Sequence, residues 1–418
     1  MFQTYINAFK IKEIRKKMLF TLLLIVVYRL GSFIPIPGVN TELLKSAVSQ
    51  YDILGFLDLL TGSSFSQFTI FAMGISPYIN ASIIIQLLTI AIPSLERLSK
   101  EEDGKVKIEK ITRYTGIVLA MVQSIGIFIG LGTKYLVDTS WLTYATIGIC
   151  STAGTAFLMW LGERITEDGV GNGVSMLIFA SIVSRVPKTF INLGQQLWVG
   201  TLPIWELLIL AVLVVGLITL VTHVDQAQRR ITVQYAKRVV GRKMYGGQST
   251  YLPIKANSNG VLPLIFALTF LQFPGMIAQF WPNSPFYTFY KTYMGTSSAI
   301  YYVIYALLII GFGFFYSSVT FNPIEMSKNL QQNGGFITGI RPGKPTSDYL
   351  GKISGRLTLF GSLFLAVVAI LPQLAMKGMA ESSAFGATSV LIMVNVALET
   401  TNQLESHMLM RHYKGFLN

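Results

Sequence analysis

Apolar stretches recur along the whole chain and alternate with shorter basic or polar segments. A helix of about 20 predominantly apolar residues crosses the hydrocarbon core of a bilayer. The pattern therefore predicts an all-α integral membrane protein with ten transmembrane helices. These spans are expected near residues 18–34, 71–92, 114–133, 141–161, 174–190, 204–222, 260–281, 299–320, 355–372 and 386–404.

The stretch 71–92 carries polar groups for which a helix surrounded by lipid has no use. Asn80 and Gln86 need polar partners, and Pro77 is expected to interrupt a backbone hydrogen bond. Such features are tolerated where a helix faces protein or a water-filled path. Just upstream, residues 53–67 are apolar but too few to span, which favours a segment that dips back into the membrane. Together the two segments are predicted to form the moving part of a pore.

Five spans in each half of the chain suggest an inverted repeat, with the halves at residues 1–190 and 191–418. An odd number of spans makes the second half enter the bilayer from the opposite side, and the functional path then lies where the halves meet. Span 174–190 has only ten strongly apolar residues before Arg185 and Pro187. It is therefore predicted to be short or interrupted and to line a cavity.

Basic residues lie mostly on one side of the predicted membrane. The chain holds 33 Lys and Arg against 20 Asp and Glu, and only 13% of its residues are charged whereas 52% are hydrophobic. The segments on the side of the two termini hold 26 of the 33 basic residues, the opposite segments hold 6, and Arg29 lies within the first span. Because positive charge accumulates in cytoplasmic loops, both termini are expected in the cytoplasm. Topology alone thus explains the net charge of +13 without a nucleic-acid partner.

Two predicted cytoplasmic loops are longer than orientation requires. Loop 223–259 contains the alternating run ITVQYAKRVV, then a Gly-Gly pair and the run QSTYLPI, which together predict a projecting β-hairpin. Loop 321–356 carries Pro342, Gly343 and Pro345 around Arg341, which favours a rigid tip over a helix. Both loops are predicted to be docking sites for a large cytosolic partner.

Candidate chemistry is sparse. The single cysteine, Cys150, lies in an apolar run and the three histidines lie at span margins or in the tail, so no metal site is expected. The glycines of EDGVGNGVS lack the strand and the Lys-Ser/Thr pair of a phosphate-binding loop, and no cofactor or catalytic residue is expected. Two other classes compete with a pore. A coupled transporter of small solutes needs ionisable groups near the midplane, and an intramembrane protease needs a Ser/His or paired-Asp arrangement; neither is found in the spans.

Aliphatic residues recur at helical spacing in the polar-lined spans. Ile75 and Ile79 are four residues apart, as are Val174 and Ile178, so each pair lies on one helical face. Bulky aliphatic side chains on such a face can close a constriction that excludes water. Ordinary helix packing explains the same spacing, just as it explains small residues such as Gly154.

Several motifs of unusual composition follow one another along the chain. They are GSFIPIPG (Gly31–Gly38), FAMGISPYINASIIIQLL (Phe71–Leu88), MWLGERITEDGVGNG (Met159–Gly173), QRRITVQYAKR (Gln228–Arg238), QSTYLPIK (Gln248–Lys255), FNPIEM (Phe321–Met326) and GIRPG (Gly339–Gly343). With these motifs in this order, the sequence closely resembles the SecY family, the central subunit of the bacterial Sec protein-conducting channel. The resemblance covers essentially the whole chain.

The resemblance implies a clamshell of two five-span halves around an hourglass pore, with a re-entrant plug helix at about 53–67. The implied pore ring is Ile75, Ile79, Val174, Ile178, Ile265 and Ile392, in which Val174 replaces the more familiar isoleucine. The implied plug side chains are Ile53, Leu54, Phe56, Leu57, Leu60 and Phe65. The implied lateral gate includes Asn80, Gln86, Asn172 and Phe273. The implied partner-docking residues are Arg242, Lys243, Arg341 and Lys344.

The function implied by the resemblance is passage of unfolded secretory polypeptides across the bacterial cytoplasmic membrane, with sideways release of apolar segments into lipid. No enzymatic activity is implied. The implied partners are the SecE and SecG subunits, the SecA motor ATPase, the ribosome, signal peptides, nascent chains and membrane lipid. Asp58 within the plug and the short carboxyl tail depart from the family pattern.

Overall fold

The structure is a computed structural model that describes residues 2–50, 52–101, 103–200, 203–235, 238–240, 243–245, 249–258, 260–279, 281, 284–295, 298–375 and 387–414. Within these ranges the chain is mostly helical, with one three-stranded and one two-stranded sheet. The helices carry the apolar segments of the sequence, and the strands lie in the segments that were predicted to be cytoplasmic loops.

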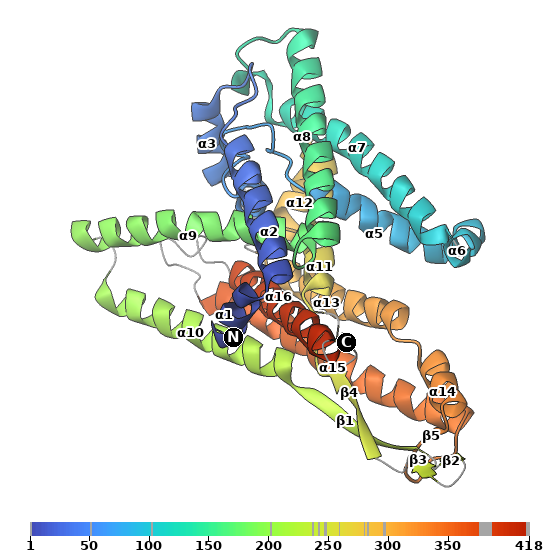
Figure 1. The fold of residues 1–418 in the computed structure, drawn as a ribbon. Helices are drawn as coiled ribbons and strands as arrows, with labels where there is room; N and C mark the ends of the chain where they lie inside the picture. Colours follow the sequence, from blue (N-terminus) through green and yellow to red (C-terminus); the bar gives the residue numbers. More distant parts are fainter. Residues whose placement is uncertain are drawn as a thin grey trace. The chain divides into compact units, whose positions relative to one another are not determined.

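In the described ranges, each of the ten predicted spans coincides with one helix (Figure 1). These helices are α2 (Lys12–Gly31), α5 (Ser76–Ala91), α7 (Gly104–Leu131), α8 (Trp141–Asp168), α9 (Gly173–Val199), α10 (Ile204–Gln226), α11 (Leu262–Gln279), α13 (Ala299–Thr320), α15 (Lys344–Ala375) and α16 (Ala387–Lys414). Among the described helices, α7, α8, α9, α10 and α15 are each long and apolar enough to cross a membrane, as is α13 taken with α14 (Pro323–Gln332). Helix α5 meets the criterion only together with the helix that follows its bend, Pro93–Lys100. The other three miss it for local reasons: charged residues at the start of α2, the short apolar part of α11 and polar residues along α16.

The helix of the predicted span 71–92 begins at Ser76 and is followed, after a bend of 101°, by α6 (Pro93–Lys100). Pro77 therefore lies in the first turn of α5, where the backbone N–H that proline lacks has no partner within the helix. The prediction that Pro77 interrupts a helical hydrogen bond is wrong. Residues 71–75 form turns instead, with Gly74 in the left-handed region at a φ of 57°.

Helix α9 contradicts the prediction of a short or interrupted fifth span. It runs from Gly173 to Val199 over 27 residues, with Pro187 inside it. A proline removes one backbone hydrogen bond, but membrane helices tolerate it where neighbouring groups satisfy the freed carbonyl. The stretch from Lys188 to Trp198 mixes apolar with polar residues, so apolar content alone does not show where this helix ends.

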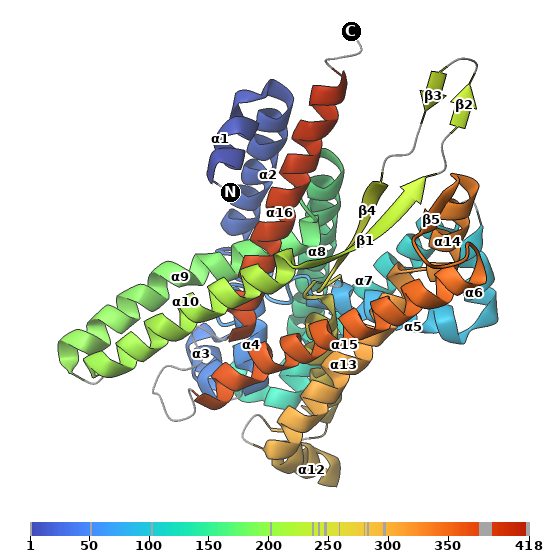
Figure 2. The same ribbon diagram turned by 90° about the horizontal axis from the view of Figure 1, so that it is seen from below.

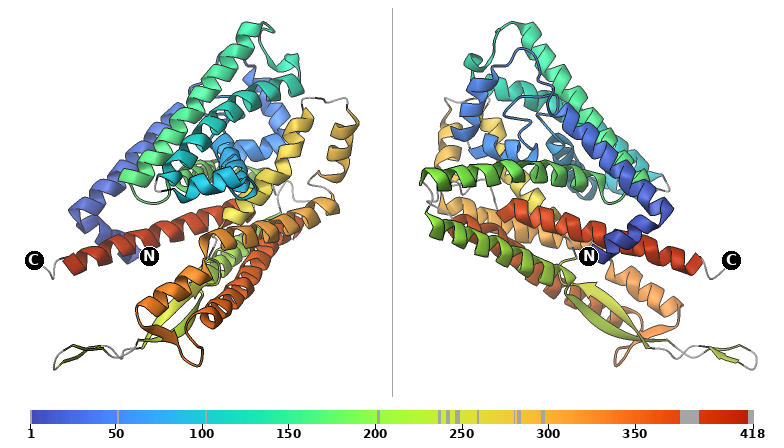
Figure 3. Two further views of the ribbon diagram at one scale, coloured as in Figure 1. Left: turned by 90° about the vertical axis from the view of Figure 1, so that its right-hand side faces the viewer. Right: turned by 60° about the vertical axis from the view of Figure 1, so that its left-hand side comes forward.

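Contacts along the chain divide it into two compact units, which are described separately here. Unit 1 comprises Met1–Ile204, Thr269–Tyr301 and Val396–Asn418, and unit 2 comprises Trp205–Leu268 and Tyr302–Asn395. In unit 1, α5 packs on α7, α7 on α8, and α8 on both α2 and α9. Both views in Figure 3 show α2 alongside α8. The division of the sequence into halves at residues 190 and 191 stays a prediction.

Shorter helices complete unit 1. They are α1 (Phe2–Lys10), α3 (Thr41–Gln50), α4 (Asp52–Leu60), the 3-10 turn η1 (Thr133–Tyr135) and α12 (Pro285–Tyr293). Of these, α4 covers only the first part of the plug helix predicted at about 53–67, because the helix ends at Leu60 and residues 61–67 form turns. It packs on α3 and on α9.

Unit 2 contains the predicted hairpin of loop 223–259. Strand β1 (Gln228–Tyr235) pairs antiparallel with β4 (Ser249–Lys255), and β5 (Gly335–Ile337) pairs with the other edge of β1 (Figure 2). Alternate side chains of β1, Ile231 and Val233, are buried against a cluster that includes Leu350 of α15. The alternation of apolar and polar residues in the sequence thus reflects a strand that buries one face against a small core and exposes the other.

Two details of the predicted loops are corrected. The chain reverses between β2 (Arg238–Val240) and β3 (Lys243–Tyr245), which pair antiparallel, and therefore before the predicted Gly-Gly turn, which lies outside the described residues. In loop 321–356, α14 and the first turns of α15 are helical, with Pro323 and Pro345 in their first turns, where proline fits. Residues 338–343 between these helices form turns, as the rigid tip predicts.

Candidate functional site

Two pairs of the expected ring residues lie at the amino-terminal ends of their helices. Ile75 precedes the first residue of α5, and its carbonyl accepts the backbone N–H of Ile79 at 3.1 Å. Both side chains are buried, as is Ile178 in the second turn of α9, whereas Val174 is half-buried. All four residues belong to unit 1.

The start of α9 is fixed by its neighbours. Asn172 caps the helix by accepting the backbone N–H of Ser175 at 3.2 Å, which satisfies one of the free donors of the first turn. A Cβ added at Gly173 would overlap the carbonyl oxygen of Gly162 in α8, so only glycine allows this approach. The position of Val174 and Ile178 is therefore set by close packing of α9 on α8.

The other two expected ring residues belong to unit 2. Ile265 lies in the first turn of α11 and is half-buried, and Ile392 lies in the second turn of α16 and is buried. The structure thus places four ring residues within unit 1 and two within unit 2. That all six converge on one axis stays a prediction.

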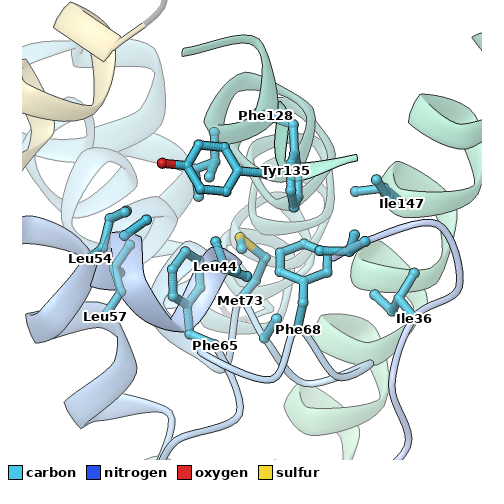
Figure 4. Close-up of a cluster of buried hydrophobic side chains, with 14 of the residues drawn as sticks. Ile36, Leu44, Leu54, Leu57, Phe65, Phe68, Met73, Phe128, Tyr135 and Ile147 are labelled. Carbon is cyan, nitrogen blue, oxygen red and sulfur yellow. The ribbon is translucent and has the colours of Figure 1, made fainter. Parts of the chain in front are cut away.

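The plug helix is packed into an apolar cluster of unit 1. Leu54 and Leu57 of α4 are buried, as is Phe65 in the turns that follow, and Leu60 is half-buried. Figure 4 shows Leu54, Leu57 and Phe65 among residues from α3, α7, α8 and the segment before α5. The labelled members of the cluster are Ile36, Leu44, Leu54, Leu57, Phe65, Phe68, Met73, Phe128, Tyr135 and Ile147. The side chains of Ile53 and Phe56 lie outside the described part.

Burial of these side chains stabilises the plug in its place. Complete burial of one Leu or Phe side chain contributes about 1.5–3 kcal/mol, so three such residues outweigh any single polar contact of the plug. Phe68, in the turn that follows, packs edge to face on Phe128 of α7 with a centroid distance of 4.7 Å. Its φ of 42° is unusual for a bulky residue and shows that the packing determines the local backbone.

The GSFIPIPG segment holds the chain that leaves the plug. The backbone N–H of Ile36 donates to the carbonyl of Phe68 at 2.9 Å, and the N–H of Ile70 donates to the carbonyl of Ile34 at 3.0 Å. Pro35 lies between these two bonds, opposite Thr69, and Pro37 follows Ile36, so neither proline occupies a position that donates in this pairing. The alternating isoleucines and prolines thus match a short antiparallel pairing with residues 68–70.

The expected gate residues make local contacts. Gln86 donates to the hydroxyl of Ser82 one turn earlier in α5 at 3.4 Å, and Asn172 is an exposed helix cap. Asn80 is buried in α5, and Phe273 is half-buried in α11. The hydrogen bonds of Gln86 and Asn172 therefore stay within their own helices or caps. A role of these residues in gating stays a prediction.

Two of the four expected docking residues are exposed at the predicted rigid tip. The side chains of Arg341 and Lys344 are solvent-exposed. The turn that carries Arg341 is braced by two hydroxyl groups: Thr346 donates to the carbonyl of Arg341 at 2.8 Å, and Ser327 donates to that of Gly343 at 2.7 Å. Arg242 lies outside the described residues, and so does the side chain of Lys243 in β3.

The sequence analysis missed one contact of the plug. Asp58 of α4 is 4% exposed and lies 3.5 Å from Arg185 of α9, although the two residues are far apart in sequence. The signal in the sequence was the presence of one acid in an apolar re-entrant segment and one base in an apolar span. Neither residue alone identifies its partner.

Comparisons with known proteins agree on one family. The SecY family model matches residues 69–401. The chain is 44% identical over 439 residues to the protein translocase subunit SecY of Streptomyces galbus, and 45% identical over 434 residues to that of Halalkalibacterium halodurans. Both alignments cover 100% of this chain and 100% of the relative.

Solved structures share the fold. One is a protein-conducting channel with a TM-score of 0.67 at 18% identity, covering 94% of this chain and 92% of that chain. Another is Sec61 in the canine ribosome-channel complex from the endoplasmic reticulum, with a TM-score of 0.62 at 17% identity and the same coverage. These likenesses confirm the predicted class, an all-α membrane protein with the architecture of this group of channels.

Proposed function

Because the chain belongs to the SecY family of protein translocase subunits, we propose that it forms a channel through which unfolded secretory polypeptides cross the membrane. The observation that carries this function is identity of about 44% to protein translocase subunits along the entire length of both chains. The family transports polypeptides and is not a family of enzymes. The chain is a multi-pass protein of the bacterial cell membrane.

The aliphatic ring of the proposal is Ile75, Ile79, Val174, Ile178, Ile265 and Ile392. Such side chains offer no hydrogen bonds that grip a passing polypeptide and no charges that solvate an ion. A charged side chain at the centre of a bilayer costs about 3 kcal/mol on insertion scales, so ions are excluded while a polypeptide displaces the flexible ring. The burial of Ile75, Ile79 and Ile178 in unit 1 supports a closed ring.

The lateral gate of the proposal separates polar from apolar segments of the passing chain. A central Leu or Ile gains on the order of 0.3–0.6 kcal/mol by entering lipid, so an apolar segment of about 20 residues gains enough to leave sideways. Polar contacts between membrane helices contribute about 0.6 kcal/mol each. We expect contacts of that size by Asn80, Gln86 and Asn172 to keep a gate closed and still allow a signal sequence to open it, although the hydrogen bonds of Gln86 and Asn172 in this structure lie within their own helix or cap.

The proposed channel needs partners that complete it and that drive the polypeptide through it, and its exposed loops offer them a docking site. SecE and SecG complete the channel, and the SecA motor or the ribosome supplies the moving polypeptide. Exposed Arg341 and Lys344 on a braced turn support docking of such a partner. The basic loops and both termini face the cytoplasm, because the excess of Lys and Arg marks that side.

A crosslinking experiment separates this function from a transporter or a protease. A photoreactive amino acid replaces Ile79, and a secretory polypeptide is stalled during export in intact membranes. We expect a crosslink at Ile79 and none at Val118, a control position in α7 that is 61% exposed and expected to face lipid. A stalled polypeptide that crosslinks to neither position, or to both equally, contradicts a polypeptide path through this ring.

A further inference from the structure

The plug carries a buried carboxylate at its end. Asp58 lies in the last turn of α4, and its side chain is 5% exposed. One carboxylate oxygen accepts the backbone N–H of Ser66 at 2.8 Å, and the other lies 3.5 Å from Nη1 of Arg185 in α9. A carboxylate in such a place stays ionised at low cost only if hydrogen bonds and an opposite charge replace its water.

Arg185 faces the plug from α9. Its side chain is 32% exposed, but the Nη1 atom that approaches Asp58 is itself buried and has no hydrogen-bond partner among the described residues. The carboxylate of Asp58 is therefore the group that compensates this end of the guanidinium. Loss of Arg185 leaves Asp58 as a buried carboxylate without an opposite charge, and loss of Asp58 leaves the buried Nη1 end of Arg185 without a partner.

The same face of α9 also contacts the chain that follows the plug helix. Ser181, one turn before Arg185, shares a 2.6 Å hydrogen bond with the hydroxyl of Tyr28 in α2. A Cβ added at Gly62 would meet the backbone of Ser181, so the two segments approach closely. The contact between the plug segment and α9 thus consists of tight backbone packing beside one ion pair.

Helix α2 also forms hydrogen bonds to the chain that follows the plug helix. The hydroxyl of Tyr28 donates to the carbonyl of Thr61, and Nη1 of Arg29 donates to the carbonyl of Gly62, both at 3.4 Å. These two contacts engage the backbone of the plug segment, whereas the contact of Asp58 with Arg185 joins two charged side chains. Of the contacts that hold the plug segment, the ion pair is therefore the one that a conservative side-chain substitution removes without altering the backbone.

We propose that Asp58 and Arg185 form an ionic latch that holds the plug closed, with Arg185 as the residue that positions it. The proposal rests on the function proposed above. When the plug moves, both charges separate and gain water. Hydration of the separated charges offsets much of their attraction, so the latch favours the closed state without making it permanent. The apolar cluster around Leu54 and Leu57 stabilises the plug helix, and the ion pair fixes the position of the carboxyl end of that helix against α9.

A double-mutant cycle on resting ion conductance tests the latch. The channel, purified with its partner subunits, is placed in planar bilayers as wild type, Asp58→Asn, Arg185→Gln and the double variant. We expect each single variant to raise the resting leak several-fold, and the double variant to leak no more than the leakier single. Lys188→Gln is the matched control, since it removes an exposed charge three residues further along α9 and leaves the leak unchanged.

Charge reversal separates a latch from loss of fold. In Asp58→Arg combined with Arg185→Asp the pair is restored in the opposite sense, and we expect the leak to fall below that of either reversed single variant. Single neutral variants that export at the normal rate and leak as little as wild type overturn the latch and leave the proposed function intact. If the fold-increase in leak of the double variant equals the product of the fold-increases of the two single variants, the two residues act independently. That result also overturns the latch.

Discussion

At the scale of single residues, the proposed ring depends on side chains that differ from their surroundings only in shape and apolarity. Ile79 and Ile178 are buried close to the starts of α5 and α9, where each helix begins after a turn that glycine permits. Val174 is smaller than isoleucine and only half-buried. In unit 1 the proposed sealing role therefore falls mainly on the isoleucines.

Replacing Ile79 and Ile178 together by glycine should raise the ion leak of the resting channel several-fold. The substitution removes the apolar bulk that excludes water from the constriction. Conductance in planar bilayers measures the effect. Ile90→Gly is the control, because it makes the same change at a position of α5 that is 55% exposed, and it accounts for the cost of glycine within a helix. Equal leak in the ring variant and the control contradicts the sealing role.

At the scale of elements, close approach of α8 to the chain before α5 depends on Gly154. A Cβ at this position would overlap the carbonyl oxygen of Ile70, whereas a Cβ at Gly194 in α9 would meet nothing within 4 Å. The sequence analysis attributed Gly154 to helix packing, and the structure shows a contact with the backbone of the segment between the plug and α5.

Gly154→Ala should destabilise the protein by about 1–3 kcal/mol, because overpacking forces the backbone of residue 70 to move. Gly194→Ala should leave the stability unchanged or raise it by up to about 1 kcal/mol, since alanine favours a helix more than glycine does. Thermal unfolding in detergent compares the two variants with wild type. A midpoint for Gly154→Ala equal to that for Gly194→Ala contradicts the packing constraint.

The elements were predictable from sequence because a span must be apolar over its whole length and a two-sided strand must alternate. For these reasons a helix at each of the ten predicted spans and the pairing of β1 with β4 could be predicted. Helix ends were less predictable. The start of α5 depends on a left-handed turn at Gly74, and α9 continues past Pro187 although a proline favours an end. Both outcomes depend on local backbone geometry that apolar periodicity does not encode.

At the scale of the whole molecule, contacts between residues far apart in sequence were the part that one sequence did not predict. Asp58 and Arg185 were each visible as isolated charges in apolar segments, but periodicity gives no information on which element faces which. The strand β5 shows the same limit, since it comes from the second loop and pairs with the hairpin of the first. The list of plug residues was predictable only through the family motifs that flank it.

The proposed docking of a motor protein is a property of the molecule together with that partner, and Arg341 tests it. Arg341→Glu should reduce motor-driven export several-fold while the channel still inserts into the membrane, because an exposed charge on a braced turn affects a partner more than the fold. Export of a secretory protein into membrane vesicles measures the effect. Lys291→Glu makes the same change at an exposed residue of α12, on the predicted outer side, and should export normally. Normal export by Arg341→Glu would remove this residue from the docking surface, whereas a loss shared with Lys291→Glu would point to net charge as the cause.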